Sequence, residues 1–195
     1  MSRRNIGYNA HMAAQVGPGQ LELVREFVNT LDLDESTEEL SSPEALASWL
    51  AERDLLPEQV KVGPAALARA VDLREALRQL LLANNGAALE PTAIEALNQA
   101  IADAALSVRF DSEGRPALAV RGSGPGAVVA PIVAIVYEAM VNDTWPRLKA
   151  CRADDCQWAF YDESRNRSGT WCDMAVCGNR AKVRAYRERQ GGAGA

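Results

Sequence analysis

Cysteine is missing from the first 150 residues of this 195-residue chain, and histidine occurs once, as His11. Cysteines that served only as small core residues would scatter through the apolar segments. The histidine lies in a polar N-terminal stretch with no partner group near it in sequence, so we assign it no role. Any metal or thiol chemistry is therefore confined to the last quarter of the chain.

Long hydrophobic runs are also missing. No apolar segment approaches the roughly 18 residues that a membrane span needs, and the start of the chain, MSRRNIGYNAHMAAQ, lacks the apolar block of a secretory signal. We expect a cytoplasmic protein that does not enter a membrane. Hydrophobic residues make up 48% of the chain and charged residues 24%, which is enough for a packed core.

Signatures of catalysis are scarce as well. No glycine-rich phosphate loop follows a predicted strand, and acidic pairs such as Glu38-Glu39 lie in a polar segment where solvation is expected. We therefore expect no enzymatic activity.

The net charge of -5 is unevenly distributed. From Trp145 to the C-terminus, 10 lysines and arginines face 6 acids, so this part carries +4 and the preceding part -9. Phosphate binding needs positive potential, so only the basic end is a plausible nucleic-acid binder.

Apolar residues recur at helical spacing over most of the chain. The spacing predicts helices from Leu21 to near Asp32, from Pro43 with Ser42 as N-cap, over 64–82 and over 91–104. The acidic segment DLDESTEEL is interpreted as a loop. The predicted fold is mainly α with a small β-hairpin in a helical domain, followed by a small C-terminal module. The predicted boundaries are a flexible tail over 1–18, the helical domain over 19–144, the C-terminal module over 145–190 and a flexible tail over 191–195.

A period of two interrupts the helices. Leu106, Val108 and Phe110 alternate with polar residues, and an extended pattern resumes over 117–120 after a turn that contains Gly114, which predicts a hairpin. The next segment, 127–141, is apolar on most sides. It is the best candidate for a central buried helix.

All four cysteines fall within 27 positions. They form the pattern C-x4-C-x15-C-x4-C with Cys151, Cys156, Cys172 and Cys177. Two short-spaced pairs separated by a loop suit a tetrahedral zinc site, since each pair supplies two thiolates. Four protein ligands would fill the coordination shell, so we expect one structural Zn²⁺ per chain.

Three other interpretations of the cysteines remain open. Disulfides need an oxidising compartment, a thioredoxin-like pair has two intervening residues where this chain has four, and spacing alone does not exclude an iron-sulfur cluster. Zinc is the favoured interpretation.

A basic segment follows the last cysteine. In GNRAKVRAYRERQ, Val183 and Tyr186 are expected to face the zinc core, while arginines at i, i+4 and i+7 line another face. Trp158 and Phe160 indicate a short strand in the finger. The predicted nucleic-acid contacts are Arg165, Arg167, Arg180, Lys182, Arg184, Arg187 and Arg189.

The run Cys177-Gly178-Asn179-Arg180, together with the preceding Trp171-Cys172 pair, resembles the CGNR zinc finger. The segment FVNTLD over 27–32 and the Ser42-Pro43 helix are similar to the ABATE domain of bacterial stress-related regulators. The resemblance implies that the C-terminal module is a treble-clef-like zinc finger with the four cysteines as ligands. It also implies DNA binding by the finger and an N-terminal sensing domain. One departure is Gly169-Thr170, where the family often has a basic residue.

The leading hypothesis is therefore a zinc-dependent transcription regulator that binds duplex DNA, with a helical domain that senses a small-molecule effector or forms a homodimer. The alternatives are a zinc-stapled protein-interaction module and an RNA-binding module, for which exposed aromatic residues would be expected.

Overall fold

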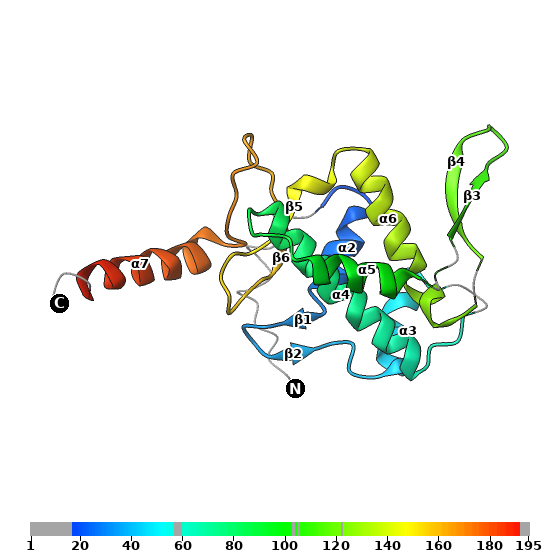
Figure 1. Ribbon diagram of the computed structural model, residues 1–195, viewed down its shortest axis with the longest axis horizontal. Coiled ribbons are helices and arrows are strands. Elements are labelled where there is room, and N and C mark those ends of the chain that lie inside the picture. The colour runs from blue at the N-terminus through cyan, green and yellow to red at the C-terminus, as the bar shows by residue number, and fades with distance from the viewer. Residues whose placement is uncertain (1–16, 57–59, 103, 105, 122, 192–195) are drawn as a thin grey trace.

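The computed structural model describes residues 17–56, 60–102, 104, 106–121 and 123–191. About half of the chain is helical, and the described strands form small antiparallel two-stranded sheets, as the sequence predicted. Helices α2 to α6 form one body, α7 projects from one end of it, and the β3–β4 hairpin stands at the other end (Figure 1). His11 and most of the predicted N-terminal tail lie outside the described residues.

Helix α2 (Leu21–Val28) is shorter than predicted. Its apolar face is buried, but the helix ends before Thr30, whose hydroxyl donates to the carbonyl of Phe27 at 2.8 Å. The chain then forms β1 (Leu31–Asp32), which pairs with β2 (Thr37–Glu38), so the acidic segment interpreted as a loop contains a short hairpin. The predicted helix end near Asp32 was wrong, because side-chain capping competes with the helical hydrogen bonds.

The next three helices begin at prolines, as predicted. Helix α3 (Pro43–Ala51) has Ser42 as its N-cap, with the hydroxyl oxygen 3.2 Å from the amide of Ala45. Helix α4 (Pro64–Asn84) is the longest, and α5 (Pro91–Ile101) packs against it. No described helix has the length and apolar character to cross a membrane.

The predicted hairpin is present as β3 (Leu106–Phe110) and β4 (Pro116–Val120). A 3₁₀ turn, η2 (Pro125–Val129), then leads into α6 (Ala130–Val141). The prediction that this segment is buried is only half correct. One side of α6 is in the core, whereas Tyr137, Met140 and Val141 are exposed.

The C-terminal part starts with the 3₁₀ turn η3 (Trp145–Arg147) and the antiparallel pair β5 (Leu148–Ala150) and β6 (Ala159–Tyr161). A π-helical turn, η4 (Met174–Gly178), runs into α7 (Asn179–Gly191). Both strands contribute to the main core, which continues across the predicted boundary between residues 144 and 145 through Leu148, Ala150 and Ala159.

Buried polar side chains of helix α4 and of its C-cap residue Asn85 hold the C-terminal part. The Asn85 amide donates to the carbonyls of Ala150 and Thr170, both at 2.8 Å, and the Arg78 guanidinium donates to the carbonyl of Gln157 at 3.1 Å. Because Arg78 is almost fully buried, these bonds lie in a low-dielectric interior where their loss is costly. The cysteine segment is therefore built on the helical body.

Candidate metal centre

The four cysteine sulfurs converge on one point. All four Sγ atoms lie within 4.8 Å of one another, and three of the four residues are buried. The Sγ atoms of Cys156 and Cys172 are 3.6 Å apart, and those of Cys172 and Cys177 are 3.7 Å apart. Four thiolates at about 2.3 Å from a tetrahedral zinc ion are separated by about 3.8 Å, whereas a disulfide bond is about 2.05 Å long.

Short turns place each cysteine pair. Cys151 directly follows β5, and the next turn is closed by the amide of Cys156, which donates to the carbonyl of Ala153 at 2.9 Å. In the second pair, the Asp173 carboxylate accepts hydrogen bonds from the amides of Ala175 and Val176 and caps the turn that carries Cys177. Each turn thus directs two thiols to the same side.

The thiols perturb one another strongly. Hydrogen bonds from the Cys156 and Cys172 thiols lower the pKa of Cys151, whereas the pKa values of Cys156 and Cys172 are raised, in each case first by the hydrogen bond with Cys151 and further by burial. Four thiols in contact, three of them buried, cannot all ionise without a compensating cation. A divalent ion that prefers thiolate sulfur, such as Zn²⁺, is the group that this donor set fits.

A packed shell surrounds the cysteines. Trp158 and Trp171 pack against the cluster. A Cβ on Gly178 would meet the side chain of Met174 and lie 3.2 Å from Cδ1 of Trp171, so a larger residue at this position would displace these side chains. Phe160, which was predicted to lie in a short strand of the finger, is fully buried in β6.

Arg180 links the cysteine centre to the helical body. Its two Nη atoms donate to the two carboxylate oxygens of Asp34 at 3.0 Å each, and Nη2 also lies 3.5 Å from the Sγ of Cys177. Asp155 approaches the same guanidinium at 3.6 Å. The hydrogen bonds to Asp34 raise the pKa of Arg180, so its charge is permanent.

The structure places the other predicted phosphate contacts on the surface. Arg167 pairs with Asp143 at 3.1 Å, and Arg184 lies 3.9 Å from Asp155. Within the described part of the chain, no ion pair joins the remaining basic residues of the set. These exposed residues are Arg165, Lys182, Arg187 and Arg189.

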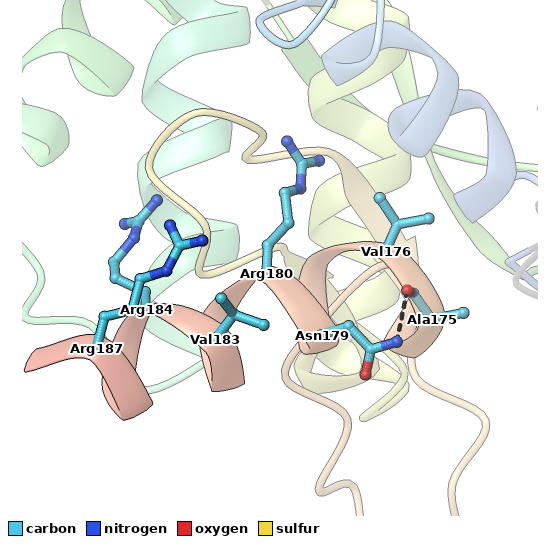
Figure 2. A pocket seen from close by; sticks show the side chains of 7 residues that line it. All are labelled: Ala175, Val176, Asn179, Arg180, Val183, Arg184 and Arg187. Atoms are coloured by element: carbon cyan, nitrogen blue, oxygen red, sulfur yellow. Dashed lines mark hydrogen bonds between the residues drawn. The ribbon is translucent and has the colours of Figure 1, made fainter. Parts of the chain in front are cut away.

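A groove runs along the first turns of α7. Arg180, Arg184 and Arg187 share this face of the helix with Val176 and Val183 (Figure 2). The expectation that Val183 and Tyr186 face the zinc core was wrong, because their side chains are 49% and 58% exposed. The helix projects away from the body, so its apolar residues have little to pack against.

Sequence reasoning missed the acidic partners of this region. Asp34 lies in the turn between β1 and β2, and only the fold brings it to Arg180 across 146 positions. It also missed the pair of Lys149 and Asp162, which are both buried with 2.7 Å between Nζ and Oδ2. The one available signal was a lysine inside a short apolar strand, where an unpaired charge is not tolerated.

Asp162 and Lys149 hold the loop that leads to the second cysteine pair. Burial acts to raise the pKa of Asp162, but hydrogen bonds from Lys149, Ser164 and Gly169 outweigh it and lower the pKa to about 2. The Lys149 ammonium also donates to the carbonyls of Arg167 and Gly169, at 2.6 and 3.0 Å. These bonds fix the base of the loop that presents Arg165.

Two family models match the chain. The model described as "Putative stress-induced transcription regulator" (ABATE) matches residues 21–143, which is more than half of the chain, and the "CGNR zinc finger" model matches residues 147–190. No curated protein is similar enough to the chain to count as a match. Both matches agree with the resemblance seen in the cysteine motif and the N-terminal helices.

Proposed function

Because the chain belongs to the ABATE family and ends in a CGNR zinc finger, we propose that it is a zinc-dependent transcription regulator that binds duplex DNA through α7. The observation that carries this proposal is the position of α7. The cysteine centre holds the start of the helix, while the remainder projects into solvent with its basic side chains exposed.

We assign one structural Zn²⁺ to Cys151, Cys156, Cys172 and Cys177. The convergence of the four sulfurs and the separations near 3.7 Å support this assignment. With four thiolates bound, the ion has no free position for water or substrate, so the centre stabilises the fold and does not catalyse a reaction. Its binding energy contributes directly to the stability of the segment that carries α7.

The proposed DNA contact rests on the size and charge of α7. Its 13 residues give α7 a length of about 20 Å at 1.5 Å per residue. The major groove of duplex DNA is wide enough to admit an α-helix. The exposed cations on it are Lys182, Arg184, Arg187 and Arg189. The acidic body repels phosphate and directs the duplex to α7 and to the neighbouring loop with Arg165 and Arg167.

The helical domain supplies effector sensing or dimerisation in this proposal. A groove of about 310 Å³ lies between α4 and α5, and Asp72, Gln79 and Thr92 contribute to its lining. Space of this kind at a helix–helix contact suits a small ligand. Arg180 and Asp34 would connect such a domain to the finger.

A zinc-stapled interaction module is the second candidate function. The observation in its favour is the exposure of Val176, Val183 and Tyr186 on and beside α7, because apolar side chains on a projecting helix suit a protein groove. The same side chains would also contact thymine methyl groups in a major groove. Direct binding measurements separate these uses.

The test is a gel-shift titration of the zinc-loaded protein at several salt concentrations against random duplex DNA, single-stranded DNA and RNA. We expect duplex binding whose logarithm of affinity falls linearly with the logarithm of salt concentration. Protein stripped of metal by a chelator is the matched control and should bind weakly. Preferential binding of RNA, or no binding to any nucleic acid, would contradict the proposal.

A further inference from the structure

The β3–β4 hairpin has one entirely apolar face. In its antiparallel register Leu106 is opposite Val120, Val108 is opposite Leu118 and Phe110 is opposite Pro116, and residues directly opposite each other point to the same side of the sheet. The base of this face is half-buried, but Val108 and Phe110 near the tip are 61% and 70% exposed. The hairpin is therefore an arm with an uncovered apolar surface.

A second uncovered apolar surface runs along α6. Tyr137, Met140 and Val141 follow helical spacing on the side away from the core, and Tyr137 and Val141 are 56% and 66% exposed. A helix that is apolar on both sides normally has both sides covered. In α6 the inner side packs against α2 and the core, and the outer side does not.

The two surfaces belong to one region of the molecule. Strand β4 contacts α6, and Figure 1 shows the arm extending beyond that contact, beside the body. A two-stranded hairpin with both edges unpaired is marginally stable by itself. Exposed apolar surface of this kind is characteristic of a protein–protein interface.

We propose that a second copy of this chain covers both surfaces, with the arm of each protomer packed on the outer side of α6 in the other. Each protomer carries one arm and one α6 surface. A two-fold axis therefore lets the dimer cover all four apolar surfaces and leaves none free to bind a further copy. The inference rests on the dimerisation role proposed above for the helical domain. It does not involve zinc or DNA.

Area supports a second copy as the partner. The exposed parts of five large apolar side chains amount to roughly 500 Å² per protomer, which brings a dimer to roughly 1,000 Å², the lower bound of a specific interface. These side chains are Val108 and Phe110 on the arm and Tyr137, Met140 and Val141 on α6. Arg109 alternates with Val108 and Phe110 and therefore lies on the opposite face of the arm, so no charge of β3 interrupts the proposed contact.

The test is a mixing experiment with two variants, Phe110→Asp in the arm and Tyr137→Asp on α6. In the proposed dimer each variant alone disrupts both arm–helix contacts, so the dissociation constant should rise at least about 30-fold. A mixture retains one intact contact, because the normal arm of Tyr137→Asp meets the normal α6 of Phe110→Asp. Light scattering after size exclusion, with one variant tagged, should therefore detect heterodimers.

The control variant is Leu89→Asp, which places the same charge at an exposed apolar position in the α4–α5 connection. It should leave the wild-type dimer intact. A wild-type protein that stays monomeric at several hundred micromolar would overturn the proposal, since the arm would then cover its own α6 or serve another protein. A Tyr137→Asp variant that still dimerises would overturn it as well, because the arms would then pair with each other.

Discussion

The side-chain amide of Asn29 and the backbone of Ala159 form a reciprocal pair of hydrogen bonds. Nδ2 of Asn29 donates to the carbonyl of Ala159 at 2.9 Å, and Oδ1 accepts from the amide of Ala159 at 2.7 Å. Both residues are buried, and 130 positions separate them. The amide thus acts as one more residue of a β-ladder along β6 and joins the helical body to the finger.

Replacing Asn29 by alanine should lower the free energy of unfolding by about 3 kcal/mol, because it leaves a buried donor and a buried acceptor on Ala159 without partners. Denaturant unfolding monitored by far-ultraviolet circular dichroism measures this loss. Asn98→Ala on the exposed side of α5 is the matched control and should change stability by less than about 0.5 kcal/mol. Equal losses in the two variants would contradict the role of the Asn29 amide.

Replacing Cys172 by serine should release the metal, because one of the four thiolates is removed. We expect hydrogen-exchange protection to be lost over 171–191 but kept in β5 and β6, whose side chains belong to the main core. Wild-type protein stripped by a chelator should show the same pattern. Loss of protection throughout 148–191 would mean that the metal, and not the core, holds these strands.

Reversing the charge of Arg184 or Arg187 should weaken duplex binding, because each side chain would place a carboxylate where a phosphate is expected. The slope of log affinity against log salt should flatten by about 0.9 for each phosphate that the protein no longer neutralises, with zinc content unchanged. Lys61→Glu, on the exposed connection before α4, is the matched control and should bind like the wild type. Unchanged binding of both arginine variants would favour the interaction module.

Arg180 is expected to act on the finger more than on DNA. Its bidentate pair with Asp34 and its contact with Cys177 predict that Arg180→Gln lowers metal affinity about tenfold. Chelator competition measures this loss, and Arg165→Gln, an exposed arginine of the same finger, should leave metal affinity unchanged. A double-mutant cycle with Asp34→Asn should give a coupling of about 1 kcal/mol. Additive effects would show that the pair does not stabilise the finger.

Removing Lys149 should destabilise the protein by about 3 kcal/mol, because Asp162 would remain as a buried carboxylate without its cation. The exposed Lys61→Met is the control.

The pKa of Asp162 is about 2 in the folded protein, below its ordinary 3.8. The contribution of the Asp162 carboxylate to the stability of the fold is therefore complete above about pH 4 and is lost as the pH falls towards 2. In Lys149→Met this pKa should rise, which a carboxyl titration by nuclear magnetic resonance detects.

The pattern of residues by itself was enough for most of the local elements, though not for the end of α2 or for β1 and β2, and it was enough for the cysteine centre. The Ser42-Pro43 start of α3 and the alternation in β3 and β4 are signals that neighbouring residues carry, and the structure confirms them. The two cysteine pairs could also be identified from the sequence, because each pair lies on one short turn. The structure brings the four sulfur atoms of these pairs together.

Only the tertiary structure decided what lies between these elements. The pairing of Asn29 with Ala159, of Arg180 with Asp34 and of Arg78 with Gln157 spans 79 to 146 positions, and no periodicity encodes a contact at that distance. The exposure of single side chains could not be predicted from the sequence either. Val183, Tyr186 and the outer side of α6 are apolar, as buried residues usually are, but the structure exposes them. Hydropathy states what a side chain prefers to contact, whereas the packing of distant elements determines whether this chain provides that contact.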